Sequence, residues 1–380
     1  MKFIKILTLI LVIIVSLTTS CNKEKLNNVG KINKRYFITK DDARYIAERF
    51  NFCRNNTNYR ITTNRTIKEI IPINDENNIA SYYLINYNDN AGFLILSADY
   101  RQEAVLGFNE VGNFSLSNTP IQLEEIIQEE VNEINYLREN SIDSIEQHIE
   151  DTWAMLTQPP STPIPTDPDA CSNYTYIYKG PLLSTTWSQG CGYNDLCPIA
   201  GSGCGSCGHF YTGCVATAMA QIMNYHKWPT SYNWTLMANT YGTSECAKLM
   251  RNAGLSVSMS YGCNASGAYS EDVAPALKNI FGYASSTACL SYGGNTTYMT
   301  VQSELNNNRP VYLSGSGNAG GHAWVCDGYI DGESPCNSIL FFYMNWGWGG
   351  SSNGSYAFNN WNPSGYTFNN SRKAIIIRKI

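Results

Sequence analysis

The chain has 380 residues, 43% of them hydrophobic and only 15% charged, so it can bury the core of one large domain or of two ordinary ones. A net charge of −5 offers no basic face to nucleic acid, and 12% aromatic residues are too many for a disordered coil. Composition thus excludes a basic DNA-binding protein, collagen, a coiled coil and a polytopic membrane protein, while 13 cysteines favour an oxidising compartment over the cytosol.

Residues 1–20 have the pattern of an export signal. Two lysines in the first five residues precede an apolar run from Ile6 to Leu17, which is shorter than a membrane-spanning helix needs. Small residues then lead to Cys21, as in the signals of bacterial lipoproteins. We therefore predict a secreted or cell-surface bacterial protein, anchored to the membrane through lipid on Cys21. The alternative is ordinary signal cleavage that leaves Cys21 as a spare thiol.

The next segment, 21–157, has the pattern of an α+β unit. Thr39 and the acidic residues after it can cap a helix that runs through Phe50. Residues 81–97 predict two strands joined by a turn. Apolar residues from 121 to about 149 recur at helical spacing between many glutamates, which predicts a helix with a solvated acidic face. We find no catalytic constellation in this unit.

A proline-rich stretch divides the chain. Its prolines cannot continue a helix or a central strand, so we predict a stiff, exposed linker. Residues 21–171 carry 14 Lys and Arg against 23 Asp and Glu, whereas residues 172–380 carry 10 against 8. This asymmetry indicates two units with different tasks. The predicted segments are a signal peptide (1–20), an N-terminal unit (21–157), a linker (158–170) and a C-terminal unit (171–380).

Cys214 differs from the other cysteines in its surroundings. Gly213 precedes it as a helix breaker, and the residues that follow place an apolar stripe at helical spacing. We therefore expect Cys214 at a helix N-terminus, where free backbone N–H groups and the helix dipole favour thiolate over thiol. The alternative is a core cysteine at the start of a buried helix.

A nucleophilic cysteine needs a base, and the chain has only four histidines. His148 precedes the linker, and His226 would lie about 18 Å from Cys214 along the same helix. His209 belongs to a glycine-rich loop that restrains it poorly. His322 follows paired glycines at the start of a predicted strand, where other groups can approach it closely. We therefore predict that His322 is the base rather than a structural histidine.

Two amide side chains complete the candidate site. Asn345 can accept a hydrogen bond from the second ring N–H of His322 and fix its tautomer, while the indole of Trp346 covers that bond from water. A purely structural turn rich in Trp and Gly is the alternative. Gln189, 25 residues before Cys214, can join the Cys214 backbone N–H in an oxyanion hole.

These residues lie in segments that resemble the streptopain family of papain-clan cysteine peptidases. The matching segments, in family order, are Ser188-Gln189-Gly190, Gly213-Cys214-Val215-Ala216, Gly321-His322-Ala323 and Asn345-Trp346-Gly347-Trp348. The resemblance implies a papain-like α+β fold of two subdomains. It implies Cys214 as nucleophile, His322 as base and acid, Gln189 as oxyanion donor, Asn345 as orienter of the base and Trp346 as its shield.

The same resemblance implies that the N-terminal unit is an inhibitory propeptide, most visibly at 92–99. The acidic propeptide and the mildly basic peptidase unit are electrostatically compatible. The prediction is then a secreted cysteine endopeptidase, made as a zymogen, that hydrolyses proteins or peptides without a cofactor or metal. A surface-anchored binding protein without turnover is the alternative, and a cell-wall amidase fits Gln189 and Asn345 less well.

Four cysteines between Gln189 and Cys214 are more than the family leads us to expect. They are Cys191, Cys197, Cys204 and Cys207. Disulfides are the first expectation, with zinc binding or a redox pair at Cys204 and Cys207 as alternatives. Ten cysteines remain once Cys21, Cys53 and the nucleophile are set aside, enough for five bridges. A bridge beside the nucleophile would make activity depend on redox state.

Overall fold

The computed structural model describes most of the chain from residue 35 onward. The described residues are 35–50, 65–116, 121–140, 142, 144–145, 147–157, 175–291, 295–317, 320–333, 338–357 and 372–380. The predicted signal peptide, Cys21 and the predicted linker lie outside them. Within them, none of the helices combines the length and the apolar character that a membrane crossing requires.

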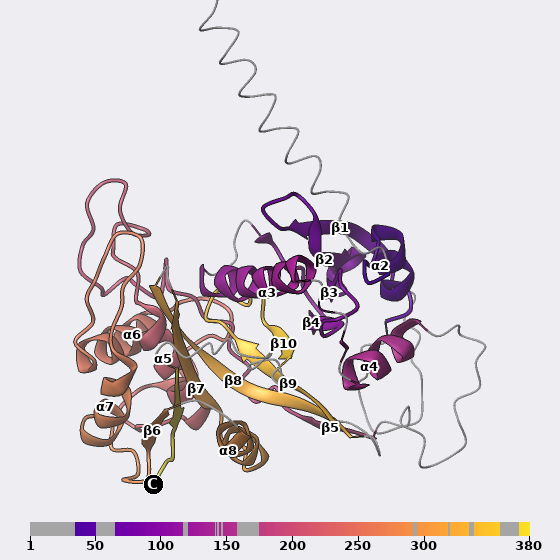
Figure 1. The fold of residues 1–380 in the computed structure, drawn as a ribbon. Helices are drawn as coiled ribbons and strands as arrows, with labels where there is room; N and C mark the ends of the chain where they lie inside the picture. Colours follow the sequence, from indigo (N-terminus) through magenta and orange to yellow (C-terminus); the bar gives the residue numbers. More distant parts are fainter. Residues whose placement is uncertain are drawn as a thin grey trace, which may run out of the picture.

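The N-terminal unit is an antiparallel sheet with helices on both faces (Figure 1). Its strands are β1 (Ile67–Asn74), β2 (Ala80–Tyr87), β3 (Phe93–Ser97) and β4 (Val105–Asn109). Its helices are α2 (Lys40–Ala47), α3 (Ile121–Glu139) and α4 (Gln147–Thr157). The predicted hairpin is confirmed, since β2 and β3 pair antiparallel on either side of the short helix η2 (Asn88–Asn90).

Helix α2 begins where the sequence predicts. The Thr39 hydroxyl accepts the backbone N–H of Asp42 at 3.2 Å, and the Asp42 carboxylate accepts the backbone N–H of Thr39 at 2.9 Å. This reciprocal pair is a capping box, which satisfies two donors that the first helical turn would leave unpaired.

The single helix predicted to about residue 149 is wrong, because α3 ends at Glu139 and α4 begins only at Gln147. Carbonyl groups of the last turn accept from side chains there, in addition to the backbone N–H groups of Asn140 and Ile142. The Asn140 side-chain amide donates to the Tyr136 carbonyl at 2.9 Å, and the Arg101 guanidinium donates to the Leu137 carbonyl at 2.9 Å. Glutamate periodicity could not reveal this stop, since Arg101 comes from a distant loop.

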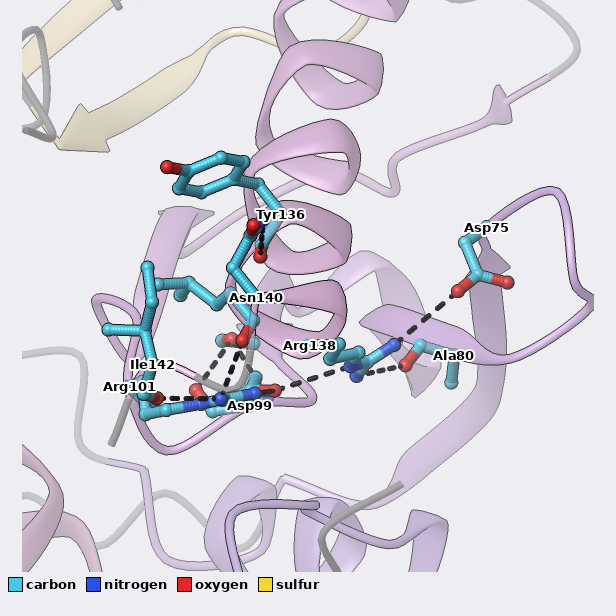
Figure 2. Close-up of polar contacts among 10 residues, drawn as sticks. Asp75, Ala80, Asp99, Arg101, Tyr136, Arg138, Asn140 and Ile142 are labelled. Atoms are coloured by element: carbon cyan, nitrogen blue, oxygen red, sulfur yellow. Dashed lines mark hydrogen bonds and ion pairs between the residues drawn. The ribbon is translucent and has the colours of Figure 1, made fainter. Parts of the chain in front are cut away.

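A buried ion cluster ties the end of α3 to the sheet (Figure 2). The Asp99 carboxylate accepts two bonds from the Arg101 guanidinium at 2.8 Å and one from Arg138 at 3.2 Å. Arg138 also donates to the Ala80 carbonyl at 2.9 Å and pairs with Asp75 at 3.6 Å. Because the cluster joins the C-terminal end of α3 to two loops of the sheet, it fixes the position of that end relative to the sheet.

The C-terminal unit places helices against a large sheet (Figure 1). Its helices are α5 (Cys214–His226), α6 (Ser244–Ser256), α7 (Val273–Asn279) and α8 (Asn295–Asn306), with short 3-10 turns η4 (Trp234–Leu236) and η5 (Ser270–Asp272). Its strands are β5 (Thr175–Lys179), β6 (Ala288–Ser291), β7 (Val311–Gly317), β8 (Gly320–Glu333), β9 (Ser338–Asn345), β10 (Gly354–Ala357) and β11 (Lys373–Ile376).

The two units share one sheet. The strand order is β1-β2-β3-β4-β10-β9-β8-β7-β11-β6, and β5 pairs with β8 off this path. At the junction, Ser355 and Tyr356 of β10 lie opposite Phe108 and Gly107 of β4. A side chain at Gly107 would meet the Tyr356 ring at 2.7 Å, so glycine permits this close approach.

Strand β8 separates two apolar cores. Ala323 and Val325 belong to the core formed with α5, α6 and α7, which we call the helical core. Trp324 and Cys326 belong to the core that also contains residues of α3 and of the N-terminal sheet, which we call the shared core. Helix α3 thus packs against β8 as well as against its own unit, and the N-terminal unit covers one face of the strand that carries His322.

Candidate active site

Cys214 is the first residue of α5, as predicted. Gly213 before it has φ of 87°, which glycine adopts without strain. A Cβ atom at Gly213 would lie 2.6 Å from the Met259 sulfur and 2.9 Å from the Ser266 carbonyl oxygen. Only glycine fits between these groups, and this brings the helix start, with Cys214, into contact with the loop around Ser266.

The Cys214 sulfur lies beside β8. The backbones of Ala323, Val215 and Cys214 itself favour its thiolate, but desolvation outweighs them and raises the pKa of the Cys214 thiol above its usual value. The expected preference for thiolate at the helix terminus is therefore not met in this structure. The effect of the Ala323 backbone on this pKa nevertheless places the sulfur near the residue that follows His322.

The His322 imidazole is buried among tryptophans. It stacks on Trp324 with ring centroids 6.0 Å apart and on Trp346 with centroids 6.2 Å apart. Its relative exposure is 4%, and desolvation lowers the pKa of His322 to about 4 despite a hydrogen bond to the Trp346 carbonyl. At neutral pH the ring is therefore neutral.

Cys214 and His322, the predicted nucleophile and base, lie at the same strand but on different faces. Cys214 packs with the helical core, on the side of Ala323, whereas His322 stacks on Trp324 in the shared core. Successive residues of a strand point to opposite faces, so the two side chains lie on opposite sides of β8. Both are neutral here, and the thiolate–imidazolium pair is not formed.

The expected hydrogen bond from His322 to Asn345 is not formed among the described residues, and the role of Asn345 as orienter of the base stays a prediction. The Asn345 amide donates to the Thr185 carbonyl at 2.8 Å, and its oxygen accepts from the Gln221 amide at 3.2 Å. Both partners lie on the α5 side. The carbonyl oxygen of the next residue, Trp346, lies 3.1 Å from His322 Nε2 and occupies the place assigned to Asn345.

Gln221, for which no role was predicted from the sequence, is buried and bonds to three separate residues. Its side-chain oxygen accepts from the Thr185 hydroxyl at 2.9 Å and from the Trp187 backbone N–H at 3.3 Å, and its amide donates to Asn345. Gln221 thus ties α5 to the segment before Gln189 and to the end of β9. The sequence offered one signal for this role: Gln221 is a polar residue two helical turns after Cys214, among the apolar residues of the same helix.

Gln189 lies next to the start of α5. Its carbonyl accepts the backbone N–H of Thr212 at 3.1 Å, so its segment runs beside the residues that lead into Cys214. The neighbouring Trp187 carbonyl accepts the N–H of Gly349 at 3.1 Å, which joins this segment to the turn after β9. The role of the Gln189 side chain as an oxyanion donor stays a prediction.

Trp346 and Trp348 flank the base from the turn after β9. Trp346 is 2% exposed and covers one side of the imidazole. Trp348 had no role predicted from the sequence. Its indole nitrogen lies 3.1 Å from His322 Nε2, and its relative exposure is 36%. The alternating Trp and Gly residues of this turn were the only sequence signal.

Two other histidines have structural partners. His209 Nδ1 lies 2.7 Å from the Cys197 carbonyl oxygen, within the disulfide-rich loop. His226 Nδ1 lies 3.2 Å from the Tyr283 hydroxyl, at the far end of α5 from Cys214. These contacts agree with the elimination that left His322.

Disulfides join the cysteine-rich loop to itself and to a second loop. Cys191 pairs with Cys207, and Cys204 pairs with Cys263. The zinc and redox-pair alternatives for Cys204 and Cys207 are therefore wrong. Five bridges were also too many, because four of the ten cysteines are free thiols. These are Cys197, Cys246 and Cys326, which are buried, and the partly exposed Cys289.

We expect the Cys204–Cys263 bridge to support both stability and turnover. It closes a loop of 59 residues, and the loop around Cys263 contacts Gly213 through Ser266. The double change of Cys204 and Cys263 to serine should cost about 2–4 kcal/mol of unfolding free energy and lower kcat/KM. Serine variants test this better than a reductant, which would also act on Cys214.

Urea unfolding of the full chain and turnover after activation measure the two effects. Cys289→Ser, at a partly exposed free thiol, is the matched control and should change neither. Equal stability and equal turnover of the double variant and the control would contradict the assigned role of the bridge.

Comparisons with known proteins agree with this geometry. The family model "Peptidase C10 family" matches residues 187–242 and 230–356, and "Spi protease inhibitor" matches residues 35–134. Streptopain of Streptococcus pyogenes is 30% identical over 335 residues, which cover 75% of each chain. The thiol protease/hemagglutinin PrtT of Porphyromonas gingivalis is 29% identical over 320 residues, and the chain spans 34% of its length.

A solved structure, a fragment of prointerpain A from Prevotella intermedia, superposes with a TM-score of 0.60 at 25% identity and covers 82% of this chain and 98% of its own. The fold is that of a papain-like cysteine peptidase with two subdomains, preceded by an inhibitory propeptide unit. The chain belongs to the Peptidase C10, or streptopain, family and is a cysteine peptidase zymogen. A binding protein without turnover is not favoured.

Proposed function

We propose that this zymogen is an exported endopeptidase with Cys214 as nucleophile and His322 as general base and acid. The proposal rests on the position of Cys214, at the N-terminus of the buried helix α5 and against the core that contains Ala323, the residue directly after His322. Thiolate attack on a peptide carbonyl forms an acyl-enzyme, and the imidazolium gives its proton to the leaving amine. Water activated by the neutral imidazole then releases the acid and restores the thiol.

Gln189 and the Cys214 backbone N–H would donate to the oxyanion in both steps. In the described arrangement the Trp346 carbonyl oxygen lies 3.1 Å from Nε2 of His322 and helps to hold the ring. This partner is uncharged, so the base relies on geometry and on burial by tryptophans rather than on a nearby anion.

The described arrangement corresponds to the latent state. The N-terminal unit extends the peptidase sheet through β4 and β10 and contributes α3 to the shared core behind His322. Its removal would uncover the face of β8 on which the imidazole now lies. We propose that cleavage in the predicted linker at 158–170 releases this unit and lets the His322 side chain rotate toward Cys214.

Cleavage assays test the endopeptidase activity. Full chain is incubated with casein and with an internally quenched peptide blocked at both ends, before and after linker cleavage under reducing conditions. Turnover of both substrates only after cleavage, and its loss with a thiol-directed epoxide, is the expected result. A processed protein that cleaves peptides with free termini but spares the blocked peptide would be an exopeptidase, and one inert on all substrates would contradict the proposal.

We further propose that the protein is exported and anchored through lipid on Cys21, from the pattern of residues 1–21. Labelling of expressing cells with a tagged fatty acid should mark the protein, and Cys21→Ala should release it from the membrane fraction. Unlabelled protein found only in the medium would favour ordinary signal cleavage.

A further inference from the structure

One ring nitrogen of His322 has two partners with opposite requirements. The Trp346 carbonyl oxygen and the Trp348 indole nitrogen each lie 3.1 Å from Nε2. A protonated Nε2 can donate to the carbonyl, whereas an unprotonated Nε2 can accept the indole N–H. Nε2 cannot do both at once, so the two tryptophans compete for the proton state of this nitrogen.

The two states differ in what His322 can do. When Nε2–H donates to Trp346, the lone pair of the neutral ring is on Nδ1, which can take the proton of a thiol once the ring has turned toward Cys214. When Nε2 accepts from Trp348, the ring proton is on Nδ1, and the only lone pair is already occupied. An imidazolium carries protons on both nitrogens and therefore cannot accept a hydrogen bond from Trp348.

The position of Trp348 allows it to leave. It lies in a turn whose glycines, Gly347, Gly349 and Gly350, have φ of 74°, 67° and 87°. Its indole reaches in from the surface, whereas Trp324 and Trp346 are buried in the shared core. Rotation of Trp348 into solvent would leave the stack of the imidazole on Trp324 and Trp346 in place.

We propose that Trp348 is a positioning residue that holds His322 in a proton state unable to accept the Cys214 proton. When the Trp348 indole moves away, Nε2 becomes protonated and donates to the Trp346 carbonyl. This inference rests on the proposed role of His322 as the base. Trp348 is thus a brake on the peptidase that belongs to the peptidase unit itself and acts in addition to the covering N-terminal unit.

Nitrogen NMR of the imidazole distinguishes the two states, because protonated and unprotonated ring nitrogens have well-separated shifts. Full chain labelled at histidine nitrogen is prepared with Cys214→Ala, which prevents self-cleavage. With only four histidines, a His322→Gln sample assigns the signal. We expect the Nδ1–H tautomer with Trp348 present and the Nε2–H tautomer in Trp348→Phe, which keeps an aromatic ring but lacks the N–H.

Trp324→Phe is the matched control. Its indole stacks on the same imidazole, but its N–H donates to the Met344 sulfur at 3.2 Å and does not reach Nε2. The control should retain the Nδ1–H tautomer. The same tautomer in Trp348→Phe and in the parent, or an Nε2–H tautomer in the parent, would overturn the inference.

A second measurement follows Cys214 itself, in protein freed of the N-terminal unit by an added protease that cuts the linker, so that His322 can turn toward the intact thiol. Iodoacetamide labelling of the Cys214 peptide, read by mass spectrometry, separates it from the free thiol of Cys289. We expect Trp348→Phe to label about tenfold faster, as a shift of one pKa unit toward the ion pair would give, and Trp324→Phe to label at the parent rate. Equal rates for Trp348→Phe and the parent would remove the role of Trp348 as a brake. Neither measurement reads peptide hydrolysis by this protein, so an inactive peptidase would count against the proposed function and not against this inference.

Discussion

Changing Cys214 to alanine is expected to lower kcat/KM of the processed protein by on the order of 10⁴-fold or more, as loss of the nucleophile does in other acyl-transfer enzymes. In the proposed mechanism Cys214 supplies the sulfur that becomes acylated. None of the four free cysteines elsewhere among the described residues starts a helix beside β8. Its removal leaves substrate binding and the oxyanion donors in place, so KM should change far less than kcat. Turnover of the blocked, internally quenched peptide gives both constants.

The matched control is Cys289→Ala, a partly exposed free thiol on β6. It should keep the parental kcat/KM and the same sensitivity to the epoxide inhibitor. Thermal unfolding checks that both variants fold, since Cys214 is partly exposed and its loss removes little buried volume. Persistent turnover in Cys214→Ala, or its loss in Cys289→Ala, would assign the nucleophile to another residue.

Local signals in the sequence identified the elements of the site. Gly213 before an apolar stripe predicted the start of α5, and the capping box at Thr39 predicted the start of α2. Both depend on residues close together in the chain, and the structure confirms both. The scarcity of histidines singled out His322 without any knowledge of the fold, and the structure brings it to the strand beside Cys214.

Contacts between distant residues decided what the sequence could not predict. Asn345 forms hydrogen bonds with Gln221 and Thr185, 124 and 160 residues away, and in this arrangement it does not contact His322 through a hydrogen bond. The pKa of Cys214 is set by desolvation in the assembled fold, which outweighs the helix terminus that the sequence reveals. Tertiary contacts of this kind leave no periodic pattern in a single sequence.

The junction of the two units shows the same limit. Opposite net charges made their association plausible, but the described contact is a strand pairing of β4 with β10 and a shared apolar core. Gly107 is the residue that permits it, and a glycine in a short strand is ambiguous without its partner Tyr356. Because backbone hydrogen bonds and apolar burial depend weakly on salt, we infer that ionic strength alone does not release the propeptide.

Asp99→Asn is expected to destabilise the N-terminal unit by about 3–5 kcal/mol, the cost of leaving buried cations without their anion. Asp99 is 1% exposed and accepts hydrogen bonds from both Arg101 and Arg138, which are nearly buried themselves (Figure 2). The amide keeps the shape of the side chain, removes its charge and replaces one accepting oxygen by an NH2 donor that faces a guanidinium. Urea unfolding of full chain carrying Cys214→Ala, with hydrogen exchange of α3 read separately, measures the effect.

Asp89→Asn is the control, because Asp89 is exposed in the turn between β2 and β3 and asparagine tolerates its positive φ of 57°. It should stay within about 0.5 kcal/mol of the parent. Since the Asp99 cluster fixes the end of α3, and α3 covers the His322 face of β8, Asp99→Asn with Cys214 intact should also process itself faster than Asp89→Asn. Faster exchange in α3 without faster processing would mean that this helix stabilises the propeptide but does not restrain the site, and equal stabilities of the two variants would contradict the anchoring role of the cluster.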